Sequence, residues 1–348
     1  MTRRTPVGIR DIGDALGLSM MSVSRALRGV EGVSAGTRIE VIQAAKRMGY
    51  RPNRNARSLA SAHSTLIGVS IPSLFSDVFP EILDGMRATF DHAGFDTLID
   101  TTHYNTAREA DWAERMLDWN AAALVLCGVD HEPDLRRRLR DLRIPTLEFW
   151  DTTDDPIDVC VGIDHWKAGA DLAEHLLACG YTRPAFIGVP EGRDTRADKR
   201  LAGLVATYAS AGIDAVDVRR IDHRATFEAG ALATESLLAA EGPRPDVLAY
   251  LNDHMAFGGL STCMRLGLSI PDAIGIAGFN DLEINKILPM PITTIITPRT
   301  RMGEIGARNI IARIKGAVVE RCVTIPTELR IGHTTRAPLS SGGPFSSN

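Results

Sequence analysis

Hydrophobic positions recur every three or four residues in three short segments at the start of the chain. This period predicts helices at about 9–16 and 20–27, and a third helix after Ser34. Between the first two, Gly17 allows a tight turn and Ser19 is a natural N-cap for the helix that follows. The start of the chain is therefore expected to form a small helical unit.

The third of these helices has boundary signals of its own. Ser34 can cap its N-terminus, and Gly49 ends it. We expect its apolar side to consist of four residues at steps of three, namely Ile39, Ile42, Ala45 and Met48.

From Thr65 onward the pattern changes to apolar runs of strand length separated by amphipathic stretches. The run LIGVSIP is followed by a predicted helix at about 78–94, and similar runs are AALVLCG, IPTLEFWD, DVCVGID, RPAFIGVP, DVLAYLND and IGIAGFND. Strands that are apolar on both faces and alternate with helices predict parallel sheets covered by helices. The strand count exceeds one domain, so we expect two lobes, with DVCVGIDHWKAG as a crossover between them.

Charge is distributed unevenly along the 348 residues. The whole chain has a formal net charge of −4, but its first 60 residues carry eleven basic and four acidic side chains. A cationic unit joined to an anionic body is typical of a polyanion-binding module fused to a second domain. The alternative is a chance cluster of solvated arginines.

Several classes of protein are disfavoured by what the sequence lacks. There is no apolar run of the ~20 residues that a membrane helix needs, and no secretory signal, so we expect a cytoplasmic protein without a membrane partner. The five cysteines contain no CxxC pair, which argues against a zinc site or a disulfide framework and suits a reducing compartment; they are Cys127, Cys160, Cys179, Cys263 and Cys322. We expect no metal and no cofactor.

The first two predicted helices and their glycine turn form a helix-turn-helix pattern. In this motif the second helix lies in the major groove, where its N-terminal side chains meet base edges. Small polar, thioether and guanidinium groups can all contact bases or phosphates there. The candidate DNA-binding residues are Ser19, Met20, Met21, Ser22, Ser24 and Arg25. The alternative is a three-helix cap with no ligand.

The segment from Ile9 to Pro72 resembles the N-terminal signature of the LacI/GalR family of bacterial regulators. The blocks RLAGL, DVLAYLNDHMAFG, GIAGFNDLEI and ITTIITPRTRMGEIGA also resemble family blocks in the expected order, so the resemblance covers nearly the whole chain. It departs at Gly8, where the family usually has a capping threonine, and at Gly13, usually alanine. Both changes should weaken the first helix by up to about 1 kcal/mol.

The resemblance implies an α/β fold with a three-helix helix-turn-helix domain at 1–50 and a hinge helix at 51–62. A periplasmic-binding-protein-like body of parallel sheets flanked by helices follows at 63–335. Its first lobe would comprise about 63–163 and 293–324, and its second about 164–292 and 325–335. We expect residues 336–348 to form a disordered tail.

The resemblance also implies how the hinge works. Two subunits of a homodimer would meet on a pseudo-palindromic, double-stranded operator, and the hinge helices would then fold in the minor groove. Leu59 would be the wedge between base pairs, with Asn53, Arg54, Ala56 and Arg57 beside it. The alternative is a plain linker with one incidental leucine.

The body carries none of the motifs GxxxxGK[ST], GxSxG, HExxH or GxGxxG, so we expect a ligand sensor and not an enzyme. A periplasmic transport protein shares this plan but would not carry a basic helix-turn-helix. By resemblance, the effector-binding residues lie after strands or at helix starts, and they are Ser73, Phe79, Asp151, Arg196, Arg200, Asn252, Asp253 and Asn280.

Four segments are similar to the gluconate-utilisation repressors within the family, namely PSLFSDVFPEILDGM, MLDWNAAALVL, EFWDTTDDPIDVCVGIDH and TPRTRMGEIGA. This branch implies a sugar-acid effector such as gluconate, whose carboxylate would meet Arg200 with Arg196 or Lys199 nearby. Asn280 stands where many relatives have an acid, which suits an anionic ligand. A neutral sugar and a phosphorylated sugar acid are the alternatives. We expect a repressor that the ligand relieves, the other possibility being a co-repressor.

Overall fold

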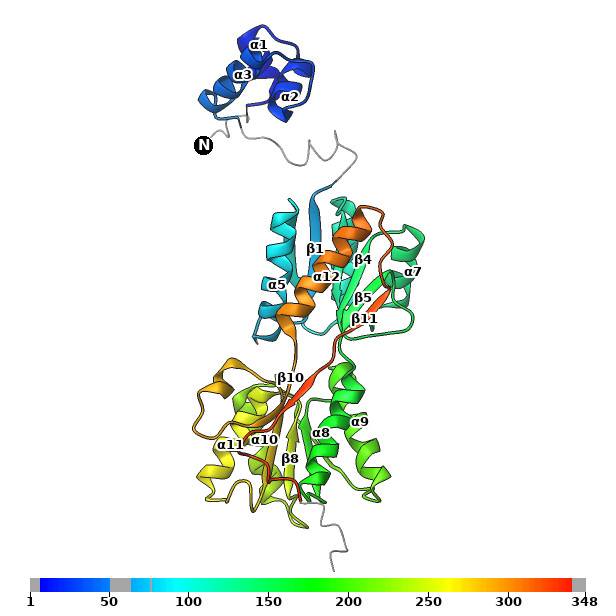
Figure 1. Ribbon diagram of the computed structural model, residues 1–348, viewed down its shortest axis with the longest axis vertical. Coiled ribbons are helices and arrows are strands. Elements are labelled where there is room, and N and C mark those ends of the chain that lie inside the picture. Colours follow the sequence, from blue (N-terminus) through cyan, green and yellow to red (C-terminus); the bar gives the residue numbers. More distant parts are fainter. Residues whose placement is uncertain (1–6, 51–63, 76, 340–348) are drawn as a thin grey trace, which may run out of the picture. The chain divides into compact units, whose positions relative to one another are not determined.

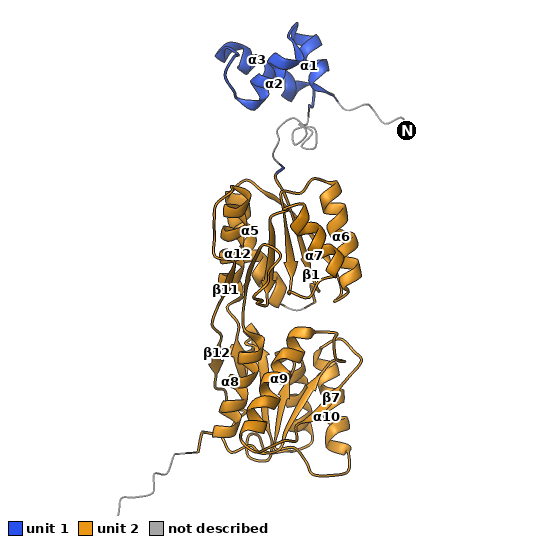
Figure 2. Ribbon diagram, turned by 90° about the vertical axis from the view of Figure 1, so that its right-hand side faces the viewer, with its two compact units in different colours: residues 1–64 blue, residues 65–348 orange. Residues whose placement is uncertain are grey.

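The computed structural model describes residues 7–50, 64–75 and 77–339, which form two compact units, 1–64 and 65–348 (Figure 2). The predicted hinge and residues 340–348 of the predicted tail lie outside the described residues. None of the helices within the described ranges has both the length and the apolar character needed to span a bilayer.

The first unit consists of three helices, α1 (Ile9–Leu16), α2 (Met20–Arg28) and α3 (Ala35–Arg47). Both predicted caps form, because Ser19 accepts a hydrogen bond from the Ser22 backbone N–H at 3.1 Å and Ser34 accepts one from Thr37 at 3.1 Å. Gly17 makes the turn between α1 and α2 with a φ of 64°. The core contains Ile12, Val23, Ala26, Val41, Ala44 and Ala45.

The predicted apolar side of α3 is wrong in its first half. Ile39 and Ile42 are 57% and 51% exposed, while Val41 and Ala44 are buried beside Ala45. Steps of three residues drift by about 60° around an α-helix, so a stripe that includes Ala45 leaves the core-facing side before it reaches Ile39. The Val41–Ala44–Ala45 spacing follows the helix face more closely.

The second unit contains two six-stranded sheets, each with its helices forming one lobe (Figure 1). The first sheet is parallel, in the order β11-β5-β4-β3-β1-β2. Its strands are β1 (Leu66–Ile71), β2 (Asp96–Thr101), β3 (Ala123–Cys127), β4 (Thr146–Trp150), β5 (Val159–Gly162) and β11 (Cys322–Thr324). The first-lobe helices are α5 (Val78–His92), α6 (Thr106–Asp118), α7 (Pro133–Asp141) and α12 (Arg299–Ile314), with α5 packed along α12.

The second sheet has the order β12-β10-β9-β8-β6-β7 and is parallel except for β12, which pairs antiparallel with β10. Its strands are β6 (Pro184–Gly188), β7 (Asp217–Arg220), β8 (Val247–Tyr250), β9 (Gly275–Asn280), β10 (Thr293–Ile296) and β12 (Glu328–Arg330). The second-lobe helices are α8 (His165–Ala178), α9 (Thr195–Ser210), α10 (Phe227–Ala239) and α11 (Asp253–Arg265), with a 3₁₀ turn η1 (Glu283–Lys286).

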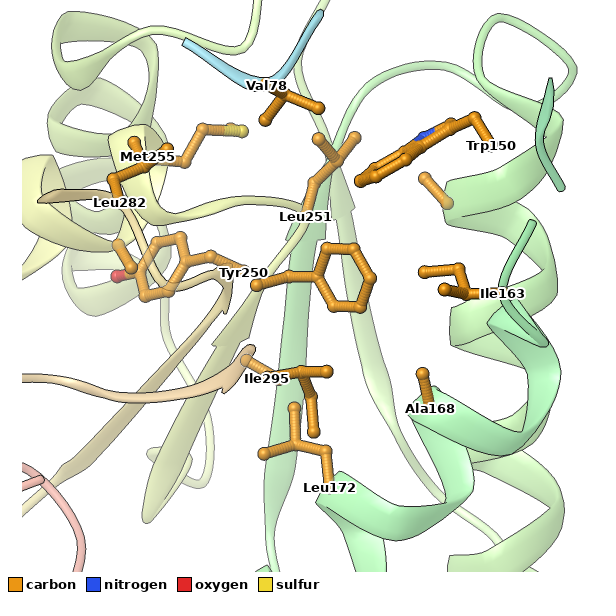
Figure 3. Packing of buried hydrophobic residues seen from close by; sticks show 14 of the residues in the cluster. Val78, Trp150, Ile163, Ala168, Leu172, Tyr250, Leu251, Met255, Leu282 and Ile295 are labelled. Carbon is orange, nitrogen blue, oxygen red and sulfur yellow. The ribbon is translucent and has the colours of Figure 1, made fainter. Parts of the chain in front are cut away.

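The chain crosses between the lobes after β5, after β10 and after β11. The first crossing lies within the predicted segment. β10, which the sequence analysis assigns to the first lobe, pairs with β9 in the second sheet, so the second crossing follows Ile296. Apolar side chains of both lobes form one buried cluster, in which Val78, Trp150 and Leu251 lie near one another at the junction (Figure 3).

The expectation about cysteines needs correction. Cys160 and Cys322 form a disulfide, because they sit directly opposite each other on the neighbouring strands β5 and β11. Their separation of 162 residues hides this proximity from the sequence. Cys127, Cys179 and Cys263 are free.

The first part of the predicted tail is also held in place. The Arg336 backbone N–H donates to the Tyr181 hydroxyl at 3.0 Å, and that of Leu339 donates to the Ala178 carbonyl at 2.7 Å. The tail therefore continues along the second lobe as far as Leu339.

Candidate functional site

The exposed face of α2 is built from the residues that the helix-turn-helix pattern predicts. Met20 and Met21 are 59% and 64% exposed although both are large and apolar. The hydroxyls of Ser19 and Ser22 are hydrogen-bonded to each other at 2.9 Å, and Arg25 is exposed further along the helix. Val23 and Ala26 bury the opposite face, so α2 is anchored on one side and presents small, thioether and cationic groups on the other.

Two exposed methionines on a short cationic helix suit contact with thymine methyl groups. The Arg28 side chain donates to the Ser24 carbonyl at the C-terminal end of α2. The five hinge positions proposed for the minor groove, Asn53, Arg54, Ala56, Arg57 and Leu59, lie outside the described residues.

A cavity of about 360 Å³ lies between the two lobes of the second unit. Its walls come from residues at the end of, or after, β1, β2 and β4 in the first lobe and β6, β7, β8 and β9 in the second. The carboxyl ends of parallel strands are where α/β sheets bind ligands. The predicted residues that line the cavity are Ser73, Phe79, Arg200, Asn252 and Asn280.

Arg200 is the most unusual of these residues. It is only 7% exposed, its Nη1 donates to His165 Nδ1 at 3.0 Å, and its Nη2 donates to the Leu251 carbonyl at 3.1 Å. The guanidinium carbon lies 4.0 Å from the centre of the Phe279 ring. Among the described residues no carboxylate forms an ion pair with it. Burial, opposed by the charge of Asp194 and aided by that of Arg196, lowers the pKa of Arg200 to about 10.

His165 orients this guanidinium. Burial and the nearby Arg200 charge hold the pKa of His165 well below its usual range, so the ring is neutral. Its Nδ1 accepts from Arg200, and its Nε2 therefore carries the proton and donates to the Trp150 carbonyl at 2.9 Å. The hydrogen bonds that hold the guanidinium thus come from neutral groups, while the nearby Asp194 carboxylate supports its charge without forming an ion pair with it.

Asn280 supplies an unsatisfied acceptor in the same cavity. Its Oδ1 is buried and has no hydrogen-bond partner, and its backbone has a φ of 116°. Its carbonyl accepts from Thr297 and from Arg299. A buried amide oxygen without a partner costs about 1–3 kcal/mol, which a ligand hydroxyl would offset.

Three of the predicted effector residues do not line this cavity. Asp151 is paired with Lys199, whose Nζ lies 2.6 Å from Oδ2. Arg196 is paired with Asp194 at 2.9 Å and lines a smaller neighbouring cavity of about 70 Å³. Although burial opposes it, the charge of Asp194 raises the pKa of Arg196.

Asp253 lies behind the cavity and holds the loop after β9. It accepts from the Thr294 hydroxyl at 2.7 Å and from the Leu282 backbone N–H at 2.8 Å. Burial raises the pKa of this carboxyl group to about 6. Its neighbour Asn252 caps α11, accepting from the Met255 backbone N–H at 3.0 Å.

Other lining residues were missed by sequence reasoning. They include His103, Tyr104, Trp150, Arg193, His223, Arg224 and Phe279. His103 and Tyr104 follow β2, and His223 and Arg224 follow β7. These two edge strands are polar and exposed, so the apolar-run pattern did not predict them or the loops behind them.

Two family models match this chain, one in each of its two units. The family described as "Bacterial regulatory proteins, lacI family" matches residues 8–53, and the "Periplasmic binding protein-like domain" matches 173–335. The HTH-type transcriptional regulator GntR of Escherichia coli K12 is 33% identical over 346 residues, covering 99% of each chain.

Two solved structures are similar to this one. A transcriptional regulator of the same family from Silicibacter pomeroyi is 34% identical with a TM-score of 0.88, covering 94% of this chain and 99% of its own. The transcription regulator GntR of Chromobacterium violaceum is 30% identical with a TM-score of 0.72, covering 78% of this chain and 99% of its own.

Proposed function

This chain belongs to the LacI family of bacterial regulatory proteins and is a DNA-binding transcriptional regulator. On that premise we propose that it represses sugar-acid utilisation genes until a sugar acid such as gluconate binds between its lobes. The relatives are transcriptional regulators, which confirms the prediction that the chain is not an enzyme.

Arg200 is the observation that carries the sugar-acid assignment. A buried guanidinium that lines a cavity without an ion-pair partner leaves a positive charge for the ligand to neutralise. A carboxylate can accept two parallel hydrogen bonds from such a group. The unsatisfied Oδ1 of Asn280 can accept from a hydroxyl of the same ligand.

The wall opposite favours a sugar skeleton. Phe79 and Trp150 pack edge to face at 6.1 Å between ring centroids, and both line the cavity. Aromatic faces cover the C–H edges of a polyol while polar groups read its hydroxyls. Arg224 adds further positive charge to the lining, whereas Arg193 is paired with Asp222 at 2.7 Å and Asp194 adds a carboxylate. A phosphorylated sugar acid is the alternative ligand to test.

On DNA, we expect a homodimer on a pseudo-palindromic operator. Two recognition helices related by a two-fold axis would occupy half-sites roughly 34 Å apart. Met20, Met21, Ser22 and Arg25 would meet bases, with Ser19 and Ser24 beside them. Leu59 would wedge the centre of the site, flanked by the other hinge positions. The site of action would be cytoplasmic, on nucleoid DNA.

Calorimetric titration with gluconate, 6-phosphogluconate, ribose and a purine tests the ligand class. The Arg200→Gln variant keeps a hydrogen-bonding side chain but removes the charge, so it should abolish binding of the acid and leave any neutral-sugar binding nearly intact. Arg265→Gln, on the surface beside Glu235, is the matched control and should bind like the wild type. Unchanged gluconate affinity in Arg200→Gln would overturn the carboxylate assignment.

A further inference from the structure

The N-terminal turns of α9 make polar bonds across the cleft. α9 belongs to the second lobe, yet its Thr195 hydroxyl donates to Asp130 Oδ2 at 2.7 Å, and its Lys199 Nζ donates to Asp151 Oδ2 at 2.6 Å. Asp130 and Asp151 both follow strands of the first lobe, β3 and β4. The two bonds therefore join the lobes through side chains alone.

The Asp151 carboxylate is held in position for its contact with Lys199. It is 1% exposed, and its Oδ1 accepts from the Thr152 backbone N–H at 2.8 Å. Its backbone packs against Gly162, where an added Cβ would lie 2.1 Å from the Asp151 carbonyl oxygen. The Asp151 side chain does not line the cavity, and its Oδ2 forms an ion pair with Lys199.

The Thr195–Asp130 hydrogen bond is also supported, by buried residues next to Asp130. Asp130 precedes His131, whose ring is buried between two carboxylates: Nδ1 lies 2.5 Å from Glu109 Oε2 and Nε2 lies 3.5 Å from Glu148 Oε1. This buried group holds the end of the loop that presents Asp130 to Thr195. Both acceptors of the first lobe are thus held in position before α9 reaches them.

We propose that the Lys199–Asp151 ion pair and the Thr195–Asp130 hydrogen bond form a latch that holds the two lobes closed before a ligand binds. Opening the cleft breaks both bonds at once, whereas a closed, ligand-filled cleft keeps them. The latch therefore raises the population of the binding-competent form and tightens effector binding without contacting the effector.

The test measures lobe separation in the ligand-free, full-length protein. Spin labels on non-natural amino acids at exposed positions 111 on α6 and 202 on α9 report the distance between the lobes. Lys199→Met removes the ammonium group, and Asp151→Asn removes the carboxylate charge. Each should add a population of longer distances that the wild type lacks.

A matched control exists within the second lobe. Lys167 pairs with Asp171 at 2.5 Å, one turn along α8, so Lys167→Met removes a lysine ion pair that joins no lobes. Its distance distribution should equal that of the wild type. Distributions in Lys199→Met and Asp151→Asn that also match the wild type would overturn the latch.

Titration with gluconate adds a second readout. Lys199→Met should weaken binding about fivefold or more, and adding Asp151→Asn to it should weaken binding little further. Weaker binding with unchanged lobe distances would make Lys199 a ligand contact and would refute the latch. If gluconate binds no form of the protein, the proposed function fails, while the distance measurement still decides the latch.

Discussion

At the scale of single residues, the cavity is distinguished by a buried guanidinium without an ion-pair partner among the described residues and by a buried amide oxygen without a hydrogen-bond partner. Arg200 lines it with neutral hydrogen-bond partners and no ion pair among the described residues, and Asn280 lines it with a side-chain oxygen that has no hydrogen-bond partner. Neither feature stabilises the folded protein by itself, since a buried guanidinium without a counter-ion and a buried acceptor without a donor both cost free energy. Such costs are offset when the ligand supplies the missing groups.

Adding a carboxylate to this cavity should therefore impair binding of an acid. Asn280→Asp introduces a negative charge that competes with the ligand for the cationic group, so gluconate affinity should fall about tenfold or more. Calorimetry on the variant measures this, with ribose as the uncharged comparison. An affinity for gluconate equal to that of the wild type would contradict an anionic ligand.

His131 gives the protein a pH-dependent stability. Burial opposes its charge, but the Glu109 carboxylate, which accepts a hydrogen bond from the ring, and the neighbouring Glu148 carboxylate outweigh burial and raise the pKa of His131 from 6.5 to about 9. A pKa raised on folding stabilises the protein fully below pH 6.5, and this stabilisation is lost as the pH rises to about 9. It amounts to on the order of 3 kcal/mol.

Urea unfolding of the wild type at pH 6 and pH 9 measures this loss. His131→Gln removes the titrating group, so most of the difference between the two pH values should disappear. The control is His92→Gln, because His92 lies exposed in the last turn of α5 and forms no ion pair with a carboxylate among the described residues. An undiminished pH difference in His131→Gln would assign the effect to another group.

At the scale of elements, local chemistry fixes the helices of the first unit well. The bounds of α1 match the prediction, and those of α2 differ from it by one residue, because glycine turns and serine caps are local signals. The Gly8 backbone N–H donates to Asp11 at 2.7 Å, so α1 keeps one capping bond although Gly8 offers no side chain. Which side of α3 is buried depends on tertiary packing, and the predicted burial of Ile39 and Ile42 was wrong.

Different variants of the first unit test its stability and its DNA recognition. Ser19→Ala and Ser34→Ala should each destabilise the first unit by about 1 kcal/mol, because each removes one N-cap hydrogen bond. Amide hydrogen exchange of this unit measures that cost. Replacing Met20 and Met21 by alanine should leave exchange unchanged but alter which operators bind in a gel shift. Unchanged operator preference would argue against base contacts by these methionines.

The body shows a different balance between sequence and structure. Strands buried on both faces, such as β3 and β4, are apparent as apolar runs, whereas the edge strands β2 and β7 are polar and were missed. The residues that follow those edge strands were missed with them. The pairing of Cys160 with Cys322 depends on strand order, which no local pattern specifies.

At the scale of the whole molecule, ligand and operator binding must be linked through a change that both sense. A shift in the arrangement of the two lobes is such a change in the second unit, and the residues that line the cavity come from both lobes. Position-by-position resemblance identified Ser73, Phe79, Arg200, Asn252 and Asn280 as lining residues. It did not reveal that Asp151 turns away to Lys199, because an ion pair across the cleft is visible only in three dimensions.

Linkage makes the sign of regulation testable from either side. If gluconate induces, it lowers operator affinity by some factor, and operator DNA must then weaken gluconate binding by the same factor, because the thermodynamic cycle closes. A coupling of about 1–3 kcal/mol is typical, so the factor should lie roughly between 5 and 150.

Operator affinity is measured by fluorescence anisotropy with and without saturating gluconate, and gluconate affinity by calorimetry with and without the operator. A scrambled duplex of equal length controls for non-specific phosphate contacts and should leave gluconate affinity unchanged at the same salt concentration. Tighter gluconate binding on the operator would show a co-repressor instead, with the effector holding the DNA-bound form together.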